Sequence, residues 1–321
     1  MKALRYLLWA FLCFLALSCV EGKRGSGSTT ASESTVQVDK ATTAERGFSM
    51  PKVPSHILPE ERMSYLAEHF WDSYNLSDSL LLANRDVTDG AFASYLWVLQ
   101  QLQGDSVAVA KSVDRLLSRS VVVESTAFER FTALFEDYLY NANSPFLNEE
   151  LYIPVLRFIV GCDELDEIYK FRPQRQLTMA LKNRMGAEAL DFSYTLADGR
   201  SARMHSLRSP YTILFFNNPD CADCARVKEY FQASALFREL WQRGELKVLS
   251  VYPDPDLELW KQSSYPEILI NSYDAKQAIS EGQLYDLKAI PTLYLLDEDK
   301  RVLLKDAPVE GVEAYLKDML K

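Results

Sequence analysis

Two cysteines with two residues between them are the part of this sequence best suited to chemistry. Cys221 and Cys224 lie in the stretch F-F-N-N-P-D-C-A-D-C-A-R-V-K-E-Y-F, where an apolar run ends and a helical pattern begins. A pair with this spacing can act as a redox dithiol, supply half of a metal site, or form a disulfide that does nothing further. Residues elsewhere in the chain distinguish among these three possibilities.

A metal site would need further ligands, because structural zinc is held by four cysteine or histidine side chains. The chain has five cysteines, without a second pair at this spacing, and three histidines, His56, His69 and His205, in dissimilar surroundings. We therefore expect no metal at the cysteine pair.

Alternating strand and helix patterns surround the cysteines between residues 187 and 321. Asp198-Gly199 predicts the turn of a hairpin, and the apolar runs 211–216 and 246–252 predict buried strands. One helix is expected from the cysteines to Gly244, and two strands and a final amphipathic helix are expected after the motif A-I-P-T. This order of elements is typical of an α/β fold.

Residues 58–186 carry helical signals throughout. Apolar residues recur at every third or fourth position in three stripes, within 63–74, 92–102 and 128–139. Stripes rich in aromatic residues could line a ligand groove, but every amphipathic helix needs an apolar face for its core. We therefore expect a compact helical bundle that is packed by these stripes.

The first residues, M-K-A-L-R-Y-L-L-W-A-F-L-C-F-L-A-L-S-C, are typical of an export signal. Lys2 and Arg5 precede an apolar run that is shorter than the ~20 residues of a membrane span. The stretch L-A-L-S-C resembles a bacterial lipobox, which implies a signal peptide over 1–18 and lipidation of Cys19. The alternative is ordinary secretion with Cys19 unmodified. Small polar residues over 19–57 predict a disordered tether.

Export sets the chemical context of the remaining residues. Outside the cytoplasm cysteines oxidise readily, so the pair must be read with disulfides in mind. Cys162 lies in an apolar helical stretch, where we expect a small buried hydrophobic residue. The formal net charge of -10 leaves no surplus of cations for phosphates, so no nucleic-acid partner is expected.

Residues 187–321 resemble the thioredoxin fold, in particular the membrane-tethered thioredoxin-like oxidoreductases of bacterial envelopes and their peroxiredoxin relatives. The resemblance is carried, in chain order, by D-F-S-Y-T-L-A-D-G-R, by the cysteine pair after a buried strand, by V-Y-P-D and by A-I-P-T-L-Y-L-L-D. It implies that the Ile290–Pro291 bond is cis and faces the dithiol as a platform for substrate. The predicted fold class is thus α+β multidomain: an N-terminal all-α bundle followed by a C-terminal α/β thioredoxin fold.

Within this resemblance the two cysteines have different roles. Disulfide exchange needs a thiolate, and Cys221 at the start of a helix would face unpaired N–H groups that stabilise an anion, which makes it the nucleophile. Cys224, one turn deeper, would resolve the mixed disulfide, so that Cys221–Cys224 is the disulfide of the oxidised form.

Two carboxylates beside the dithiol depart from the family pattern. Asp220 stands where Trp is usual and Asp223 where Pro is common. Their charges oppose a thiolate, which would favour a reducing couple. Asp223 is either a proton acceptor between the thiols or a first-turn acid that complements the helix dipole.

Two other functions compete with disulfide exchange. Peroxiredoxins similar to this region carry Thr or Ser where this chain has Asn218, so peroxide reduction is less favoured. The other is a binding or scaffold lipoprotein with an idle Cys221–Cys224 disulfide, which a fully buried Cys221 sulfur would favour.

Residues 58–186 resemble an uncharacterised domain that precedes thioredoxin-like modules in some bacterial lipoproteins. The stretches 147–156 and 183–186 carry this resemblance, which names no activity. Because the region lies directly before the redox domain, we hypothesise that it shapes substrate choice.

Together these expectations describe a membrane-anchored thiol–disulfide oxidoreductase without a bound cofactor. The expected order is a signal peptide (1–18), a lipidated Cys19 with its tether (19–57), a helical domain (58–186) and a thioredoxin-like domain (187–321). The expected partners are exported proteins with disulfides, a membrane electron donor of the thiol-reducing type, and the membrane itself through the lipid anchor. The expected location is the envelope of a Gram-negative bacterium, facing the periplasm.

Overall fold

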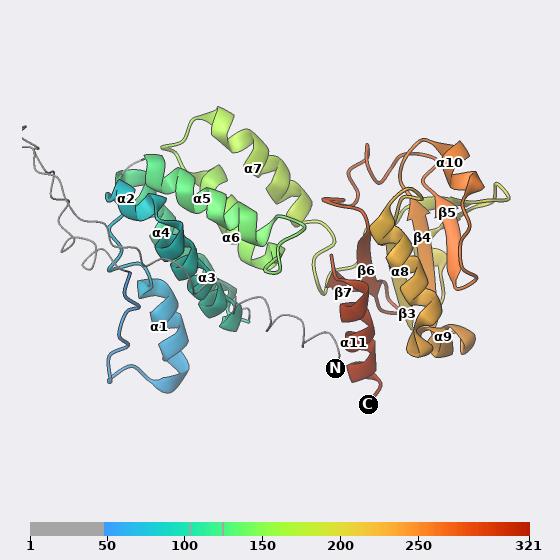
Figure 1. Ribbon diagram of the computed structural model, residues 1–321, viewed down its shortest axis with the longest axis horizontal. Helices are drawn as coiled ribbons and strands as arrows, with labels where there is room; N and C mark the ends of the chain where they lie inside the picture. Colours follow the sequence, from blue (N-terminus) through green and yellow to red (C-terminus); the bar gives the residue numbers. More distant parts are fainter. Residues whose placement is uncertain (1–47, 103, 124) are drawn as a thin grey trace, which may run out of the picture. The chain divides into compact units, whose positions relative to one another are not determined.

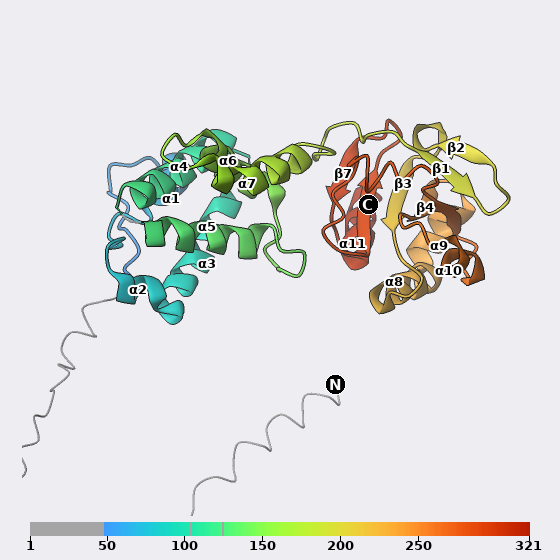
Figure 2. The ribbon, with the colours of Figure 1, turned by 90° about the horizontal axis from the view of Figure 1, so that it is seen from above.

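A computed structural model of the chain describes residues 48–102, 104–123 and 125–321. Residues 46–321 form one compact unit, in which a helical part is followed by a mixed sheet with helices (Figure 1, and from above in Figure 2). The predicted signal peptide, Cys19 and most of the predicted tether lie outside the described residues. None of the helices that the structure describes has the length and apolar character of a membrane span.

The folded chain begins within the predicted tether. The ring of Phe48 stacks on Phe70 with centroids 5.1 Å apart and lies 5.5 Å from the Trp71 ring. The Ser73 hydroxyl donates a hydrogen bond of 2.8 Å to the carbonyl of Ser49. Residues from Phe48 onward are therefore packed against the helical part, which starts before the predicted residue 58.

The helices of the helical part follow the predicted stripes. Asp78, Asn84 and Asn148 cap three of them by accepting hydrogen bonds from backbone N–H groups in the first turn, as these residue types prefer. In the described residues the helices are η2 (Pro59–Glu61), α1 (Arg62–His69), α2 (Ser79–Ala83), α3 (Arg85–Gln101), α4 (Ser106–Val123), α5 (Ser125–Leu139), α6 (Glu149–Gly161) and α7 (Glu167–Ala180).

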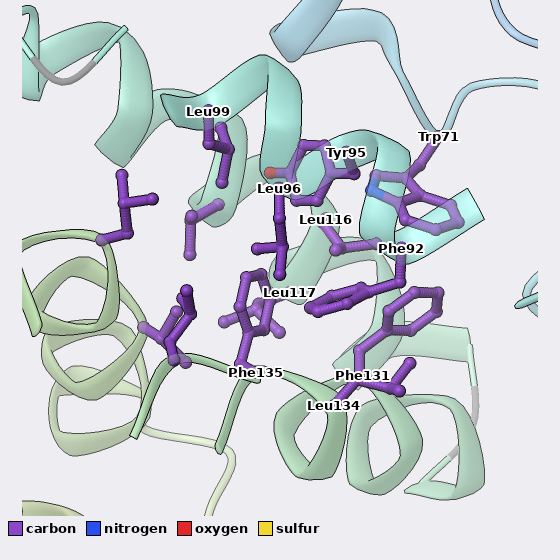
Figure 3. Close-up of a cluster of buried hydrophobic side chains, with 14 of the residues drawn as sticks. Trp71, Phe92, Tyr95, Leu96, Leu99, Leu116, Leu117, Phe131, Leu134 and Phe135 are labelled. Atoms are coloured by element: carbon purple, nitrogen blue, oxygen red, sulfur yellow. The ribbon is translucent and has the colours of Figure 1, made fainter. Parts of the chain in front are cut away.

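The three stripes meet in one apolar core (Figure 3). The Trp71 ring packs edge-to-face on Phe131 and Tyr95, with centroids 4.9 and 5.6 Å apart, and Phe92 packs edge-to-face on Phe135 at 4.9 Å. Edge-to-face contact is a favoured geometry for aromatic pairs. These rings are buried, so the prediction that the stripes pack a core is confirmed.

The C-terminal part is built on a sheet that has seven strands in the described residues, in the order β2-β1-β5-β4-β3-β6-β7. Strand β4 is parallel to β3 and β5, and the other neighbouring pairs are antiparallel. The strands are β1 (Ser193–Leu196), β2 (Ser201–Arg203), β3 (Tyr211–Phe216), β4 (Leu246–Tyr252), β5 (Leu269–Tyr273), β6 (Thr292–Leu296) and β7 (Val302–Lys305).

Both faces of the sheet are covered, which explains the uninterrupted apolar run of β3. Ile213 and Phe215 pack in one core and Leu214 and Phe216 in the other, because successive side chains of a strand point to opposite faces. The first core includes α8 (Ala222–Ala233), α9 (Ala235–Gln242) and α11 (Val309–Met319), which are visible beside the sheet in Figure 2. Segments before β1 and β6 cover the other face. The remaining helices are η3 (Met204–Ser206) and α10 (Leu257–Gln262).

Two elements differ from the predictions. The single helix expected up to Gly244 is two helices, because Ser234 ends α8 and caps α9 by accepting a hydrogen bond of 3.1 Å from the Phe237 N–H. Strand β5 was not predicted; it is held between β4 and β1 rather than by an apolar pattern of its own. The hairpin around Gly199, which takes the left-handed φ of 84°, and strands β3 and β4 are confirmed.

Candidate active site at the cysteine pair

The register of the sheet brings the two predicted parts of the site together. Strands β3 and β6 are antiparallel neighbours, and Phe216 at the end of β3 pairs with Thr292 at the start of β6. The loop that follows β3 and leads to Cys221 therefore lies at the same edge of the sheet as Ile290 and Pro291, which precede β6.

Cys221 is the N-cap residue of α8. Its Sγ accepts a hydrogen bond of 3.1 Å from the backbone N–H of Cys224. A group at this position faces the unpaired N–H groups and the positive end of the helix dipole, which stabilise negative charge. Cys221 is half-buried, so part of the residue is open to solvent.

The Ile290–Pro291 peptide bond is cis, the geometry expected from the sequence. The Sγ of Cys221 lies 3.5 Å from the carbonyl oxygen of Ile290. Ile290 and Pro291 are both half-buried, so part of each residue remains accessible beside the sulfur.

Cys224 lies one turn deeper and is fully buried, with a relative exposure of 0%. Burial raises the pKa of its thiol to about 12, and its hydrogen bond with Cys221 acts in the same direction. The charge of Lys228 opposes this rise. Cys224 is therefore protonated at neutral pH and lacks even the small thiolate fraction, a few per cent, that a cysteine of ordinary pKa has there.

The described part of the chain contains the thiols of Cys162, Cys221 and Cys224 in free form. The structure thus corresponds to the reduced pair. The predicted Cys221–Cys224 disulfide is not formed in it and stays a prediction for the oxidised form. Cys162 is buried in the helical part, with its Sγ 3.2 Å from a carboxylate oxygen of Glu164.

Two asparagines order the loop between β3 and the cysteines. The buried Asn217 amide donates to the Ser250 hydroxyl at 2.8 Å and to the Phe215 carbonyl at 3.1 Å. The side-chain amide of Asn218 donates to Asp254 at 2.8 Å, and the backbone carbonyl of Asn218 accepts from the Cys221 N–H at 3.2 Å. These bonds hold Cys221 in place before any substrate binds.

Asp223 is partnered away from the thiols. Its carboxylate is exposed and accepts a hydrogen bond of 2.7 Å from Arg226. Among the described residues, the hydrogen bonds of this carboxylate include none to Cys221 or Cys224. This geometry fits the first-turn acid of α8 better than the proton acceptor, and the proton-accepting role stays a prediction.

Sequence reasoning missed two residues beside the buried thiol. Lys228 follows Cys224 by one helical turn, and its Nζ lies 4.8 Å from the ring centre of Tyr265. The Tyr265 hydroxyl is buried with no hydrogen-bond partner among the described residues. Burial raises the pKa of Tyr265, and the nearby Tyr252 and Cys224 add to this rise. The i,i+4 spacing could have identified Lys228, whereas Tyr265 lies in a loop without a motif.

The histidines lie apart from the cysteine pair. His69 is 2.7 Å from Asp72 in the helical part, and His205 is 2.7 Å from the Ala189 carbonyl. Over the described ranges, no group of three or more His, Cys, Asp and Glu side chains is arranged to hold a metal ion. His69 and His205 thus have their partners away from the cysteine pair.

Comparison with known proteins separates the two parts of the chain. Residues 24–183 match a family model described as a domain of unknown function, DUF5106. A search of the curated proteins finds no match.

Solved structures are similar to both parts. A crystal structure of a thioredoxin-like protein from Bacteroides caccae is 40% identical, with a TM-score of 0.77, over 84% of this chain and 98% of that one. The C-terminal domain of an uncharacterised protein from Bacteroides fragilis is 45% identical over 42% of this chain and 98% of that one, with a TM-score of 0.41. The thioredoxin domain of a thiol-disulfide oxidoreductase from Bacteroides vulgatus is 14% identical over 43% of this chain and 99% of that one, with a TM-score of 0.37.

The two shorter structures cover less than half of this chain with TM-scores below 0.5 and add nothing to its assignment. The Bacteroides caccae protein is matched over nearly its whole length, and 84% of this chain is more than either part alone could supply. The chain therefore belongs to the family of thioredoxin-like proteins that this relative represents, with a DUF5106 domain in its first half.

Proposed function

We propose that the chain is a thiol–disulfide oxidoreductase whose C-terminal part has a thioredoxin fold and whose redox pair is Cys221 and Cys224. The observation that carries the proposal is the arrangement at the start of α8. The half-buried Cys221 is the N-cap, with its Sγ 3.5 Å from the Ile290 carbonyl oxygen, and the fully buried Cys224 lies one turn deeper. One accessible and one protected thiol are what a two-step exchange requires.

The first step is attack of the Cys221 thiolate on one sulfur of a substrate disulfide. A bond forms between Cys221 and that sulfur, the substrate S–S bond breaks, and the second substrate sulfur leaves as a thiolate that takes up a proton. In the second step Cys224 loses its proton and attacks Cys221. The Cys221–Cys224 disulfide forms, and the substrate leaves with two thiols. Two electrons pass from the enzyme to the substrate.

Because the pKa of Cys224 is raised, the second step depends on the loss of its proton. A buried thiol attacks only after it loses its proton, and Lys228 is the cation whose charge eases that loss. The proposal therefore assigns Lys228 a supporting role in proton release, while Ile290 and Pro291 form the surface against which a substrate segment rests.

The cycle closes when another dithiol reduces the Cys221–Cys224 disulfide. We propose that this donor is a membrane protein of the thiol-reducing type and that the substrates are exported proteins with disulfides. The export signal and the lipobox-like stretch ending at Cys19 support a lipid-anchored location in a Gram-negative envelope, facing the periplasm.

Two observations weaken the competing functions. An idle disulfide on a scaffold would favour a fully buried Cys221, whereas this residue is half-buried. A peroxidase would need a hydroxyl at position 218, where the amide of Asn218 instead donates to Asp254.

The proposal is tested by reduction of a protein disulfide with dithiothreitol as the electron source. Wild-type protein should accelerate the reaction, and Cys221→Ser should lower the rate by about a hundredfold or more, because the nucleophile is lost. Cys162→Ser is the matched control and should keep the wild-type rate. Equal rates for wild type and Cys221→Ser would contradict the proposal.

A further inference from the structure

A cleft lies where the helical part meets the cysteine-bearing part. Its volume is about 850 Å³, which is within the range of ligand-binding clefts. One wall is the loop between α5 and α6, residues 142–148, and the other includes Asp223 and Arg226 of α8 and Pro291. We call it the shared cleft.

Buried ion pairs fix one wall of the shared cleft to the other. Lys288, three residues before Pro291, contacts Glu149 at 2.5 Å and Asp306 at 2.9 Å, and Lys305 contacts the other oxygen of Glu149 at 2.5 Å. The side chains of Glu149, Lys288 and Lys305 are each 7% exposed. Because breaking a buried ion pair leaves an uncompensated charge, these contacts resist separation of the two parts.

Further contacts join the segment before the cis bond to the helical part. The Tyr140 hydroxyl donates to Asp286 at 3.2 Å, and the side chains of Lys182 and Asn183 donate to the carbonyls of Gln283 and Leu284 at 2.6 and 2.8 Å. The segment 283–288 is therefore held from the helical side over its whole length.

The loop 142–148 is itself ordered. The Ser144 hydroxyl donates to the Tyr138 carbonyl at 2.6 Å and accepts from the Phe146 N–H at 3.1 Å. The N–H of Asn143 donates to the Asn141 side chain at 3.0 Å. The wall is thus a defined surface from which Asn143 is exposed.

The lining of the shared cleft ends at residues that adjoin the reactive cysteine, although Cys221 itself is not among them. Asp223 lies between the two cysteines in sequence, and Pro291 directly follows Ile290, whose carbonyl is 3.5 Å from the Cys221 Sγ. A chain segment in the cleft would hold its own disulfide within reach of Cys221.

We propose that the shared cleft binds the polypeptide segment that carries the substrate disulfide, and that loop 142–148 of the DUF5106 region is its specificity-determining wall. This inference rests on the proposed oxidoreductase function. It gives the domain of unknown function a role: it supplies half of the substrate site.

The charges of the cleft select the kind of segment. Its lining includes five carboxylates against three cations; four of the carboxylates form ion pairs, and Glu310 is exposed and forms none among the described residues. Opposite charge on a partner favours its approach and orientation. The shared cleft therefore prefers a segment with Lys or Arg beside the disulfide over one with Asp or Glu.

The test compares cleft-narrowing variants with a matched surface variant. Asn143→Trp and Met185→Trp place a bulky ring in the cleft from two different segments, at positions that are exposed and tolerant of size. Gln101→Trp places the same ring on an exposed residue of the helical part that does not line the cleft. Each protein is given two substrates, a peptide disulfide flanked by lysines and the small aromatic disulfide of Ellman's reagent.

We expect both cleft variants to lower kcat/KM for the peptide by about tenfold. Their kcat/KM for the small disulfide should stay within about twofold of wild type, and Gln101→Trp should keep the wild-type kcat/KM for both substrates. The inference is overturned if both cleft variants reduce the peptide as fast as the control, or if peptide and small disulfide slow equally. If wild type reduces neither substrate, the oxidoreductase function itself fails.

Glu310→Lys should shift the preference from the lysine peptide towards a matched glutamate peptide by about threefold, and no shift would overturn the charge argument.

Discussion

In the helical part, the large side chains gather in one core in which Trp71 touches rings from α3 and α5 (Figure 3). In the sheet part, the apolar residues are divided between the two faces of β3, β4 and β6. In a single core of this kind the large side chains are buried against one another. A sheet covered on both faces leaves its strand ends free, and Cys221 and Ile290 lie at two such ends that the register of β3 and β6 brings together.

Both parts contain buried polar groups, some with and some without partners among the described residues. In the helical core the Tyr95 hydroxyl bonds to Ser112 at 2.7 Å, and Ser112 donates to the Ala67 carbonyl at 2.7 Å. These groups are satisfied and unreactive. In the sheet part the buried thiol of Cys224 has a raised pKa, and the Tyr265 hydroxyl beside it lacks a partner among the described residues. Unpartnered buried groups are not confined to the sheet part, since Nε1 of Trp71 in the helical core also lacks a partner among the described residues. The cysteine pair differs from the helical core in that its buried thiol lies next to the half-buried Cys221.

The largest expected effect is on the reactivity of the buried Cys224 thiol. Without this effect, the contrast drawn between the cysteine pair and the helical core would fail. In Cys221→Ser, Cys224 should be alkylated by iodoacetamide at neutral pH much more slowly than a cysteine of ordinary pKa, because burial, the largest cause of its raised pKa, remains when the Cys221 sulfur is removed. The rate should rise with pH without a plateau up to about pH 10, since only the thiolate reacts. A plateau below pH 9, measured by mass spectrometry of the folded variant, would contradict the burial argument.

The next effect concerns the junction of the two parts. Lys288→Met leaves Glu149 and Asp306 without one of their buried partners and should lower the free energy of unfolding by about 3–5 kcal/mol. Lys261→Met is the matched control, because it removes the exposed Lys261–Glu258 pair, and it should have a much smaller effect. Urea unfolding measures both. Equal effects would show that the junction is no stronger than a surface pair.

A core substitution should affect stability without touching the chemistry. Phe131→Leu removes an aromatic ring that packs on Trp71 and should cost about 1–2 kcal/mol of unfolding free energy. The rate of Cys221 with a small disulfide should stay within about twofold of wild type, because the core of the helical part does not reach the sulfur. A large loss of that rate in the folded variant would show that the core of the helical part is coupled to Cys221, which would contradict this prediction.

The smallest effect concerns the surface of the helical part. Hydrogen bonds from His69 and Arg115 outweigh desolvation and lower the pKa of Asp72 below its ordinary 3.8. A lowered pKa gives stability that is present above pH 3.8 and is lost as pH falls through the folded value. Asp72→Asn should therefore cost about 0.5–1 kcal/mol at pH 7, with the gap closing below about pH 4. A gap that is constant with pH in thermal unfolding would refute the assignment.

The sequence predicted the site better than its surroundings. Apolar runs predicted β3 and β4, and the spacing of the cysteines after a strand placed Cys221 at the start of a helix, because these are local patterns. Strand β5 was missed because its neighbours hold it, and the break at Ser234 was missed because the apolar pattern continues across it. The contacts of Lys288 with Glu149 and Asp306 join residues far apart in sequence, and no local pattern announces such a pairing.

The central claim is that Cys221 attacks the disulfides of other proteins and Cys224 releases them. The most direct test is Cys224→Ser in the full chain, followed by non-reducing electrophoresis of envelope proteins. We expect mixed disulfides on Cys221 that dithiothreitol releases and that are missing from the variant lacking both cysteines. A folded Cys224→Ser protein without adducts, or adducts that persist without Cys221, would contradict it.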